Sequence, residues 1–251
     1  MKFRLIRHAT LRLEMAGNQL LVDPVFSEIG AMKPVPGAAN PVNSPLTPLP
    51  ISVAEILNGV DAVLVTHLHR DHLDGPAIAA LPKDLPFYCQ PVDMQRLESV
   101  GFTTLEPVAE PLSRGALEII RTGGQHGTGE IGALMGMVSG FVLRAPGEPT
   151  VYVAGDTIWC DEVAESLKRF RPDVVILNSG AAQFLKGGPI TMTAEDVATV
   201  HRFAPWARLV VVHMDAWHHC LLHRGELKAT LRDANILDRV LVPDDGAEFT
   251  F

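Results

Sequence analysis

Nine residues that follow a predicted strand read Thr66-His67-Leu68-His69-Arg70-Asp71-His72-Leu73-Asp74. The run before them, residues 60–65, is short, β-branched and apolar, which predicts a buried strand. Side chains two apart in an extended segment point the same way, so His67 and His69 can share one metal ion. Asp71 and His72 lie past the strand end and can turn towards a second ion. Ligand types at this spacing predict a metal site rather than a solvated acidic loop.

The composition is that of an ordinary globular protein. The 251 residues are 47% hydrophobic and 20% charged, enough for one large domain or two small ones. A net charge of −8 argues against general binding to nucleic acid, which needs a basic surface. Charged residues near the N-terminus argue against a signal peptide, and no run of about 18 apolar residues predicts a membrane span.

Three cysteines (Cys89, Cys160 and Cys220) are widely spaced and odd in number. Such a set is no disulfide framework, and it leads us to expect a reducing, cytoplasmic location.

Strand and helix patterns alternate along the chain, as is typical of an α/β protein. A hairpin is expected over residues 3–22, with its turn at Gly17-Asn18. Further strands are expected at 87–89, 104–105, 117–122, 150–153, 173–177, 208–212 and 240–242, and helices at 52–58, 75–81, 93–100, 161–170, 193–203 and 225–234. The glycines from 127 to 140 lack the context of a phosphate-binding loop, and they predict loops and tight turns.

Residues 27–52 interrupt this alternation. Six prolines between positions 34 and 50 exclude regular helix and central strand. A loop of this length either serves the site or runs over the surface away from it. Because it follows Asp23-Pro24, this proline-rich segment is the candidate wall or lid of a cleft and the candidate element for substrate selection.

Three other predicted strands also end in metal-ligand residues. His126 follows the strand at 117–122, Asp156 the strand at 150–153, and His213 the strand at 208–212. Asp156 has an alternative role as a helix N-cap, although Asp161 suits that position better. Sites in α/β sheets gather at the carboxyl ends of strands, so these residues can converge with His67 and its neighbours. The set holds nitrogen and oxygen donors and no thiolate, which suits Zn²⁺, Mn²⁺ or Fe.

The H-x-H-x-D-H pattern of residues 67–72 resembles the signature of the metallo-β-lactamase superfamily. Its continuation into Leu73-Asp74 looks like the branch of ascorbate-6-phosphate lactonase and the N-acylphosphatidylethanolamine phospholipase D enzymes. The segments His8-Ala9-Thr10, Val22-Asp23-Pro24 and Gly155-Asp156-Thr157 are similar to that branch as well. The resemblance implies an α/β/β/α sandwich and one hydrolase domain over residues 1–251, with the proline-rich segment near the cleft.

The resemblance also implies a ligand set for two divalent ions, Zn or Mn ahead of Fe. His67, His69 and His126 would hold one ion, and Asp71, His72 and His213 the other, with Asp156 bridging. A metal-bound hydroxide would then cleave a small ester, lactone or phosphodiester. Asp74 is expected to orient a ligand imidazole. His219, in a segment similar to the family's G/A-W-x-H, and His8 are expected to stabilise an oxyanion or protonate the leaving group.

Two other classes stay open: a mononuclear iron oxidoreductase resembling persulfide dioxygenases, and a metal-binding sensor without turnover. Asp71, His72 and His213 together disfavour the first, because those dioxygenases leave the second metal position unused. The expected partner is a small molecule, with neither nucleic acid nor membrane. Related lactonases form oligomers, so a homo-oligomer is compatible with the resemblance. The roles of His218 and His223 stay undecided, and one of the histidines from 218 to 223 is expected on the surface.

Overall fold

Alternating apolar side chains form the first three strands, β1 (Lys2–Arg7), β2 (Thr10–Met15) and β3 (Asn18–Val22). Phe3 and Leu5 are buried while Lys2 is exposed and Arg4 half-buried, as the period of two requires. The β2–β3 turn is Ala16-Gly17, one residue before the predicted position, and both residues have positive φ (+50° and +74°). Such angles belong to the tight turns that join twisted antiparallel strands.

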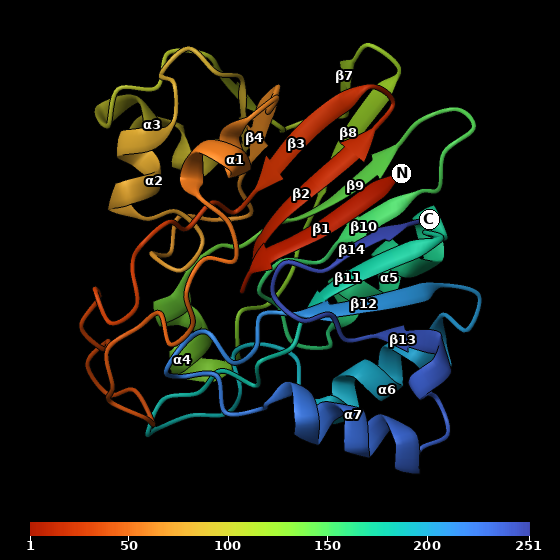
Figure 1. Ribbon diagram of the computed structural model, residues 1–251. Coiled ribbons are helices and arrows are strands. Elements are labelled where there is room, and N and C mark those ends of the chain that lie inside the picture. Colours follow the sequence, from red (N-terminus) through yellow and green to blue (C-terminus); the bar gives the residue numbers. More distant parts are fainter.

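The computed structural model describes residues 1–251, and Figure 1 labels its elements. The remaining strands are β4 (Ala62–Leu64), β5 (Phe87–Cys89), β6 (Leu105–Pro107), β7 (Leu112–Arg114), β8 (Leu117–Thr122), β9 (Gly140–Arg144), β10 (Val151–Val153), β11 (Val174–Asn178), β12 (Arg208–Val212), β13 (Val240–Leu241) and β14 (Glu248–Thr250). The helices are α1 (Val53–Leu57), α2 (Gly75–Ala80), α3 (Met94–Ser99), α4 (Gly129–Met135), α5 (Asp161–Phe170), α6 (Ala194–Phe203) and α7 (Arg224–Asp233), with 3₁₀ turns at Pro91–Asp93 and Leu237–Arg239.

The strands form two seven-stranded mixed sheets with the same succession of pairings. The first runs β14-β1-β2-β3-β4-β5-β6 and the second, read from its other edge, β7-β8-β9-β10-β11-β12-β13. In each, three antiparallel pairings are followed by three parallel ones. The C-terminal strand β14 completes the first sheet by pairing with β1, which places the two ends of the chain side by side (Figure 1).

Three apolar clusters hold the layers together. The inner faces of both sheets share one core, which includes Leu5 and Leu13 from the first sheet and Phe141 and Ile176 from the second. A second cluster lies between the second sheet and helices α5 to α7, and a third between the first sheet and helices α1 to α3. The predicted α/β/β/α sandwich is therefore confirmed. No helix is long and apolar enough to cross a membrane.

One segment differs clearly from the prediction. The glycine-rich run was expected as loops, but it contains α4, which begins after Thr128. Gly132 lies inside this helix. A larger residue would not fit there, because an added Cβ would come within 2.6 Å of the Gly127 carbonyl oxygen. The glycine here permits a close backbone approach, and Ala133, Leu134 and Met135 supply the helix propensity.

Smaller differences concern caps and short strands. The capping boxes of α1 (Ser52) and α6 (Thr193) are present, the latter as predicted. Helix α5 begins after Cys160, so Asp161 lies in its first turn rather than at the expected cap. The strands β7, β9 and β14 were not predicted. The two outer ones, β7 and β14, are three residues long and carry too little alternation to be read from sequence.

Candidate metal centre

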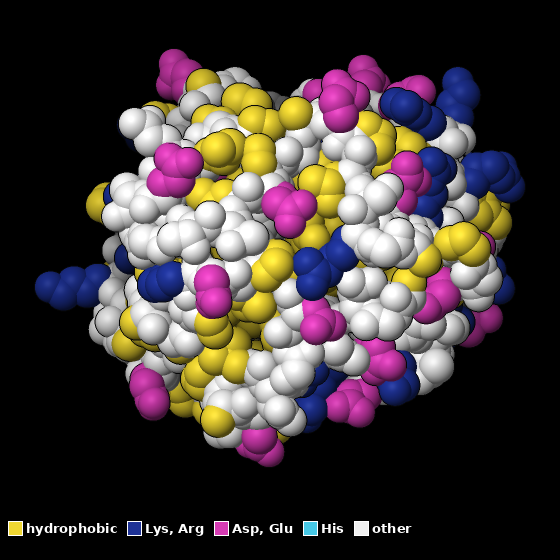
Figure 2. Space-filling view, turned by 90° about the horizontal axis from the view of Figure 1, so that it is seen from above, with side chains coloured by type: hydrophobic (Ala, Val, Ile, Leu, Met, Phe, Trp, Pro, Cys, Tyr) yellow, Lys and Arg dark blue, Asp and Glu magenta, His cyan; other side chains and the backbone are white.

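Four strands deliver the predicted ligands to one end of the molecule. The loops after β4, β8, β10 and β12 carry His67, His126, Asp156 and His213, and they gather at the end where α4 lies (Figure 1). The expected convergence at the carboxyl ends of strands is thus what the structure shows. On the face seen from above, acidic, basic and apolar side chains are interspersed and no histidine is visible (Figure 2).

The first ligand group comprises His67, His69 and His126. One ligand nitrogen from each lies within 4.8 Å of the others. His69 Nδ1 is 2.9 Å from His67 Nε2 and 3.3 Å from His126 Nε2. Burial, followed by the charge of His72, holds the pKa of His67 well below its usual value. Burial is also the main cause that lowers the pKa of His69. Imidazoles whose ring nitrogens lie this close together are placed to ligate one cation.

The second ligand group comprises Asp71, His72, Asp156 and His213, all buried and again within 4.8 Å of one another. Asp156 lies between the two groups. Its Oδ2 is 3.2 Å from His72 Nε2 and 3.6 Å from His126 Nε2, and its Oδ1 is 3.3 Å from His213 Nε2. A carboxylate in this position contacts both groups, which is the geometry that a bridging ligand requires.

Charge in the second group follows from burial and mutual attraction. Burial alone would raise the pKa of Asp156, but the charges of His213 and His72 outweigh it and hold that pKa well below its usual range. Asp71 is shifted in the same direction, against its burial, mainly by a hydrogen bond from His8. Burial lowers the pKa of His213 to about 3. Asp156 and Asp23 overcome burial at His72 and raise its pKa well above the usual value.

The residues of the second group fit a metal ion. His72 Nε2 and His213 Nε2 are buried and make no hydrogen bond, although buried polar atoms are almost always paired. Both nitrogens point towards Asp156. A cation bound among these atoms would satisfy all three side chains at once.

Supporting residues fix the ligand side chains from behind. Asp23 accepts hydrogen bonds from His72 Nδ1 and from the Thr66 backbone N–H and hydroxyl, each at 2.8 Å. His126 Nδ1 lies 2.7 Å from the Ile190 carbonyl oxygen. Asn178 donates to Asp156 Oδ1 at 2.8 Å. Partners of this kind orient ligand imidazoles and carboxylates. Sequence reasoning missed the supporting roles of Asp23 and Asn178.

Asp74 does not orient an imidazole, contrary to the prediction. Its carboxylate accepts from the backbone N–H groups of Phe26 and Ser27 and from the Ser27 hydroxyl. It also accepts from Ala77 N at 2.8 Å and so caps α2. The first backbone N–H groups of a helix have no partner within the helix. An aspartate at the N-cap therefore accepts a hydrogen bond from the N–H three residues later. Asp74 therefore ties the start of the proline-rich segment to α2.

A cleft of about 340 Å³ opens beside both ligand groups. Its lining includes the ligands His69, Asp71 and His126, together with His219. The other lining residues are mostly apolar and come from five segments: Val35, Leu68, Arg70, Met135, Phe184, Ile190 and Trp217. Val35 belongs to the proline-rich segment, so that segment forms part of the wall of the cleft. Of the two predicted alternatives, a segment that serves the site and a surface loop away from it, the structure shows the first.

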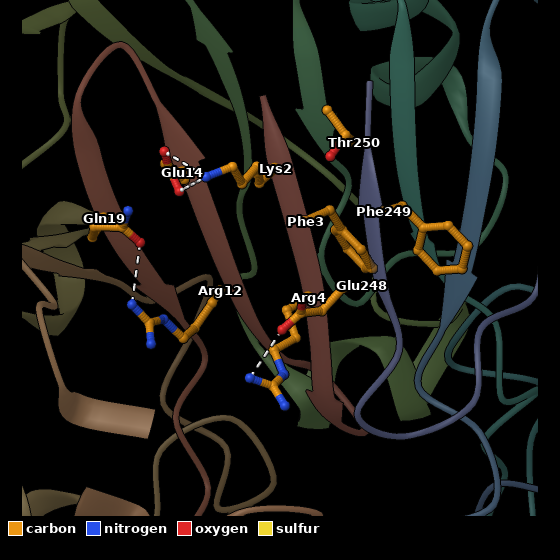
Figure 3. A pocket seen from close by; sticks show the side chains of 9 residues that line it. All are labelled: Lys2, Phe3, Arg4, Arg12, Glu14, Gln19, Glu248, Phe249 and Thr250. Atoms are coloured by element: carbon orange, nitrogen blue, oxygen red, sulfur yellow. Dashed lines mark hydrogen bonds and ion pairs between the residues drawn. The ribbon is translucent and has the colours of Figure 1, made fainter. Parts of the chain in front are cut away.

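A larger hollow of about 530 Å³ lies elsewhere, on the outer face of β14, β1, β2 and β3 (Figure 3). Its charged side chains pair with one another: Lys2 with Glu14, and Arg4 with Glu248. Arg12 donates to Gln19. These groups satisfy each other and no ligand residue is among them, so the smaller apolar cleft is the candidate active site.

The histidines outside the ligand set have different surroundings. His219 lines the cleft, with its Nε2 3.8 Å from Asp71 Oδ2, and burial lowers its pKa to about 4. His8 is completely buried with a left-handed φ of +59°, and its Nε2 is 3.5 Å from Asp71 Oδ2. The ring of His8 contacts Asp71 and stacks on Trp217, and His8 is not among the residues that line the cleft, so its action on the substrate stays a prediction. His223 is the surface histidine, paired with Asp215.

Comparison with known proteins agrees with this geometry. A family model described as the beta-lactamase superfamily domain matches residues 18–214, most of the chain. The chain belongs to this superfamily. It is 37% identical to the UPF0173 protein YddR of Bacillus subtilis (strain 168), over 98% of both chains. It is 27% identical to a UPF0173 metal-dependent hydrolase of Xanthobacter autotrophicus, over 99% of this chain and 97% of that protein.

Solved structures support the same assignment. An isothiocyanate hydrolase from Delia radicum gut bacteria is 38% identical, superimposes with a TM-score of 0.96, and is matched over 100% of this chain and 99% of that chain. This metallo-β-lactamase superfamily protein is accordingly a metal-dependent hydrolase. The resemblance to one particular branch of the superfamily stays a prediction.

Proposed function

We propose that the protein is a dinuclear hydrolase that cleaves a small, uncharged substrate with an electrophilic carbon and an apolar substituent. His67, His69 and His126 would hold one ion, Asp71, His72 and His213 the other, and Asp156 would contact both. The observation that carries this proposal is the position of Asp156, within 3.6 Å of ligand nitrogens from both groups. When bound, two such ions lower the pKa of a shared water to about 7 and polarise the bond under attack.

The cleft walls favour an apolar substrate. Leu68, Met135, Phe184 and Ile190 line the space beside the ligands, and Arg70 is the one lysine or arginine among the lining residues. A phosphodiester carries a charge that these walls would leave largely unpaired. We therefore place phosphodiesters behind uncharged carbon electrophiles.

Isothiocyanates are the first candidate substrates, because the similar solved enzyme is an isothiocyanate hydrolase. One isothiocyanate and one water would give one amine and one carbonyl sulfide. The water oxygen bonds to the central carbon, both water protons end on nitrogen, and the carbon–nitrogen bond breaks. Small lactones and esters are the second candidate class, since they too present an electrophilic carbon next to an apolar group.

His219 supplies a polar contact in the otherwise apolar cleft. Because burial lowers its pKa to about 4, the ring is neutral near pH 7 and carries a single N–H. A neutral imidazole at this position can donate one hydrogen bond to a substrate heteroatom and hold the substrate beside Asp71. Its role would be orientation of the substrate.

A substrate panel tests this proposal. The metal-loaded protein would be assayed with alkyl isothiocyanates, lactones, aryl esters and phosphodiesters, with release of amine, acid or alcohol as the readout. We expect turnover of isothiocyanates or lactones, and we expect Asp156→Ala to reduce it to background. Asp161→Ala is the matched control, because Asp161 is exposed in the first turn of α5. Iron-dependent oxygen uptake without hydrolysis, or bound metal without any turnover, would refute the proposal.

A further inference from the structure

We propose that His218 is a positioning residue that clamps the proline-rich segment, residues 27–52, in place as a wall of the substrate cleft. The inference rests on the proposed function only in taking this cleft as the place where substrate binds. His218 lies outside the ligand set, and neither of its ring nitrogens is directed at a ligand residue. Both are used to hold the segment.

The contacts define a clamp between two limbs of the segment. His218 is completely buried, and its Nδ1 lies 2.6 Å from the Ser44 hydroxyl. Its backbone N–H donates to the same hydroxyl at 3.0 Å. On the other limb, the Val35 backbone N–H donates to His218 Nε2 at 3.4 Å. Since Nε2 accepts, the proton of the neutral ring is on Nδ1, which donates to Ser44.

The clamped Val35 limb reaches the cleft. Val35 itself lines the cleft, and Gly37 and Ala38 contact the residues around Phe184. Leu185 N donates to the Gly37 carbonyl oxygen at 2.8 Å, and Ala38 forms a β-bridge with Phe184, a second lining residue. Release of the Val35 limb would therefore disturb two sides of the cleft at once.

Other residues hold the base of the segment, so loss of the clamp need not unfold it. Arg7 is completely buried and donates to the carbonyl oxygens of Ser27 (2.9 Å) and Thr47 (2.8 Å). Leu46 N donates to the Ala216 carbonyl oxygen at 2.8 Å. The imidazole of His218 thus joins the Val35 and Ser44 limbs, while Arg7 holds the segment nearer its ends.

The variants follow from these contacts. His218→Ala removes both ring hydrogen bonds. His218→Asn keeps a donor at the position of Nδ1 and so restores the bond to Ser44. Ser44→Ala removes the same bond from the other side and serves if His218→Ala does not fold. His223→Ala is the matched control, because His223 lies in the same loop but is exposed and pairs with Asp215.

Two readouts separate positioning from a general loss of stability. For a substrate found with the panel, we expect His218→Ala to raise KM by about 10-fold with kcat within about 2-fold, as the loss of two modest hydrogen bonds predicts. His218→Asn should recover most of this effect. Without any substrate, exchange of the Val35 amide hydrogen should become about 10-fold faster, while the bound metal per chain stays unchanged.

Unchanged Val35 exchange in both His218→Ala and Ser44→Ala would overturn the inference. So would a loss of metal together with kcat, because His218 would then act on the metal centre. If no substrate is turned over, the proposed function fails, and Val35 exchange still decides whether His218 holds the wall.

Discussion

Asp23→Asn should weaken binding of the ion at the second ligand group. Asp23 is buried, with a left-handed φ of +44°, and its Oδ2 accepts from both His72 Nδ1 and the Thr66 hydroxyl. An asparagine keeps the shape but places an NH₂ where the imidazole N–H donates. To avoid two facing donors, His72 must rotate or move its proton to Nε2. Either change takes away the Nε2 lone pair that would bind the ion.

The magnitude follows from what such supporting partners contribute. Loss of a hydrogen-bonded partner behind a metal-ligating histidine costs about 10–100-fold in metal affinity. That range corresponds to about 1.4–2.7 kcal/mol of binding free energy. The first group should keep its affinity, because its histidines make no hydrogen bond to Asp23. A titration against a chromophoric chelator resolves the two binding steps.

Asp74→Asn provides the matched control. Asp74 is equally buried and accepts several hydrogen bonds, but its partners are Phe26, Ser27 and Ala77 rather than a ligand. This variant should lower the melting temperature and leave both metal affinities unchanged. The reasoning is refuted if Asp23→Asn binds both ions as tightly as the unmodified protein, or if Asp74→Asn weakens the second step equally.

Three further predictions concern other parts of the molecule. Burial raises the pKa of Cys89 to about 12 and that of Cys220 well above its usual value. A thiol reagent at pH 8 should therefore modify at most one of the three cysteines before denaturation, and reaction of two cysteines in the folded protein would contradict this. An added Cβ on Gly180 would lie 2.6 Å from the Cys220 sulfur, so Gly180→Ala should cost about 1–3 kcal/mol of unfolding free energy, whereas Gly188→Ala, with open space around it, should change little in the same denaturant titration. The raised pKa of His72 keeps it protonated at pH 7 without metal. Binding of an ion to the second group should therefore release about one proton, and the affinity should rise with pH. Calorimetry in two buffers measures this release, and a binding enthalpy that does not depend on the buffer would contradict it.

The fold was predictable wherever a run of apolar residues was long enough to show a period. The strands that carry His67, Asp156 and His213 are short, but each is followed by a recognisable ligand residue. The sequence therefore predicted both the strands and the convergence of these ligands at one site. Helix α4 was missed because glycines at 129 and 132 mask its propensity. The close approach to Gly127 explains Gly132, and a left-handed φ of +57° explains Gly129. Strand β14 depends on pairing with β1 at the far end of the chain, which no local pattern reports.

The candidate site was predictable at the level of ligands and much less at the level of their support. Histidines at strand ends are recognisable from the sequence as metal ligands. An aspartate before a proline, such as Asp23, has the pattern of an ordinary turn residue. Its task depends on His72, which lies 49 residues further along the chain. The same holds for His8 and His218, whose surroundings arise only when separate segments pack together.

The content of bound metal per chain tests the central claim most directly. The protein would be purified without added metal and analysed by elemental analysis beside Asp156→Ala. A bridging Asp156 predicts close to two Zn or Mn ions per chain, and one or none in the variant. A single iron per chain that Asp156→Ala leaves unchanged would contradict the dinuclear site and the role of Asp156 in it.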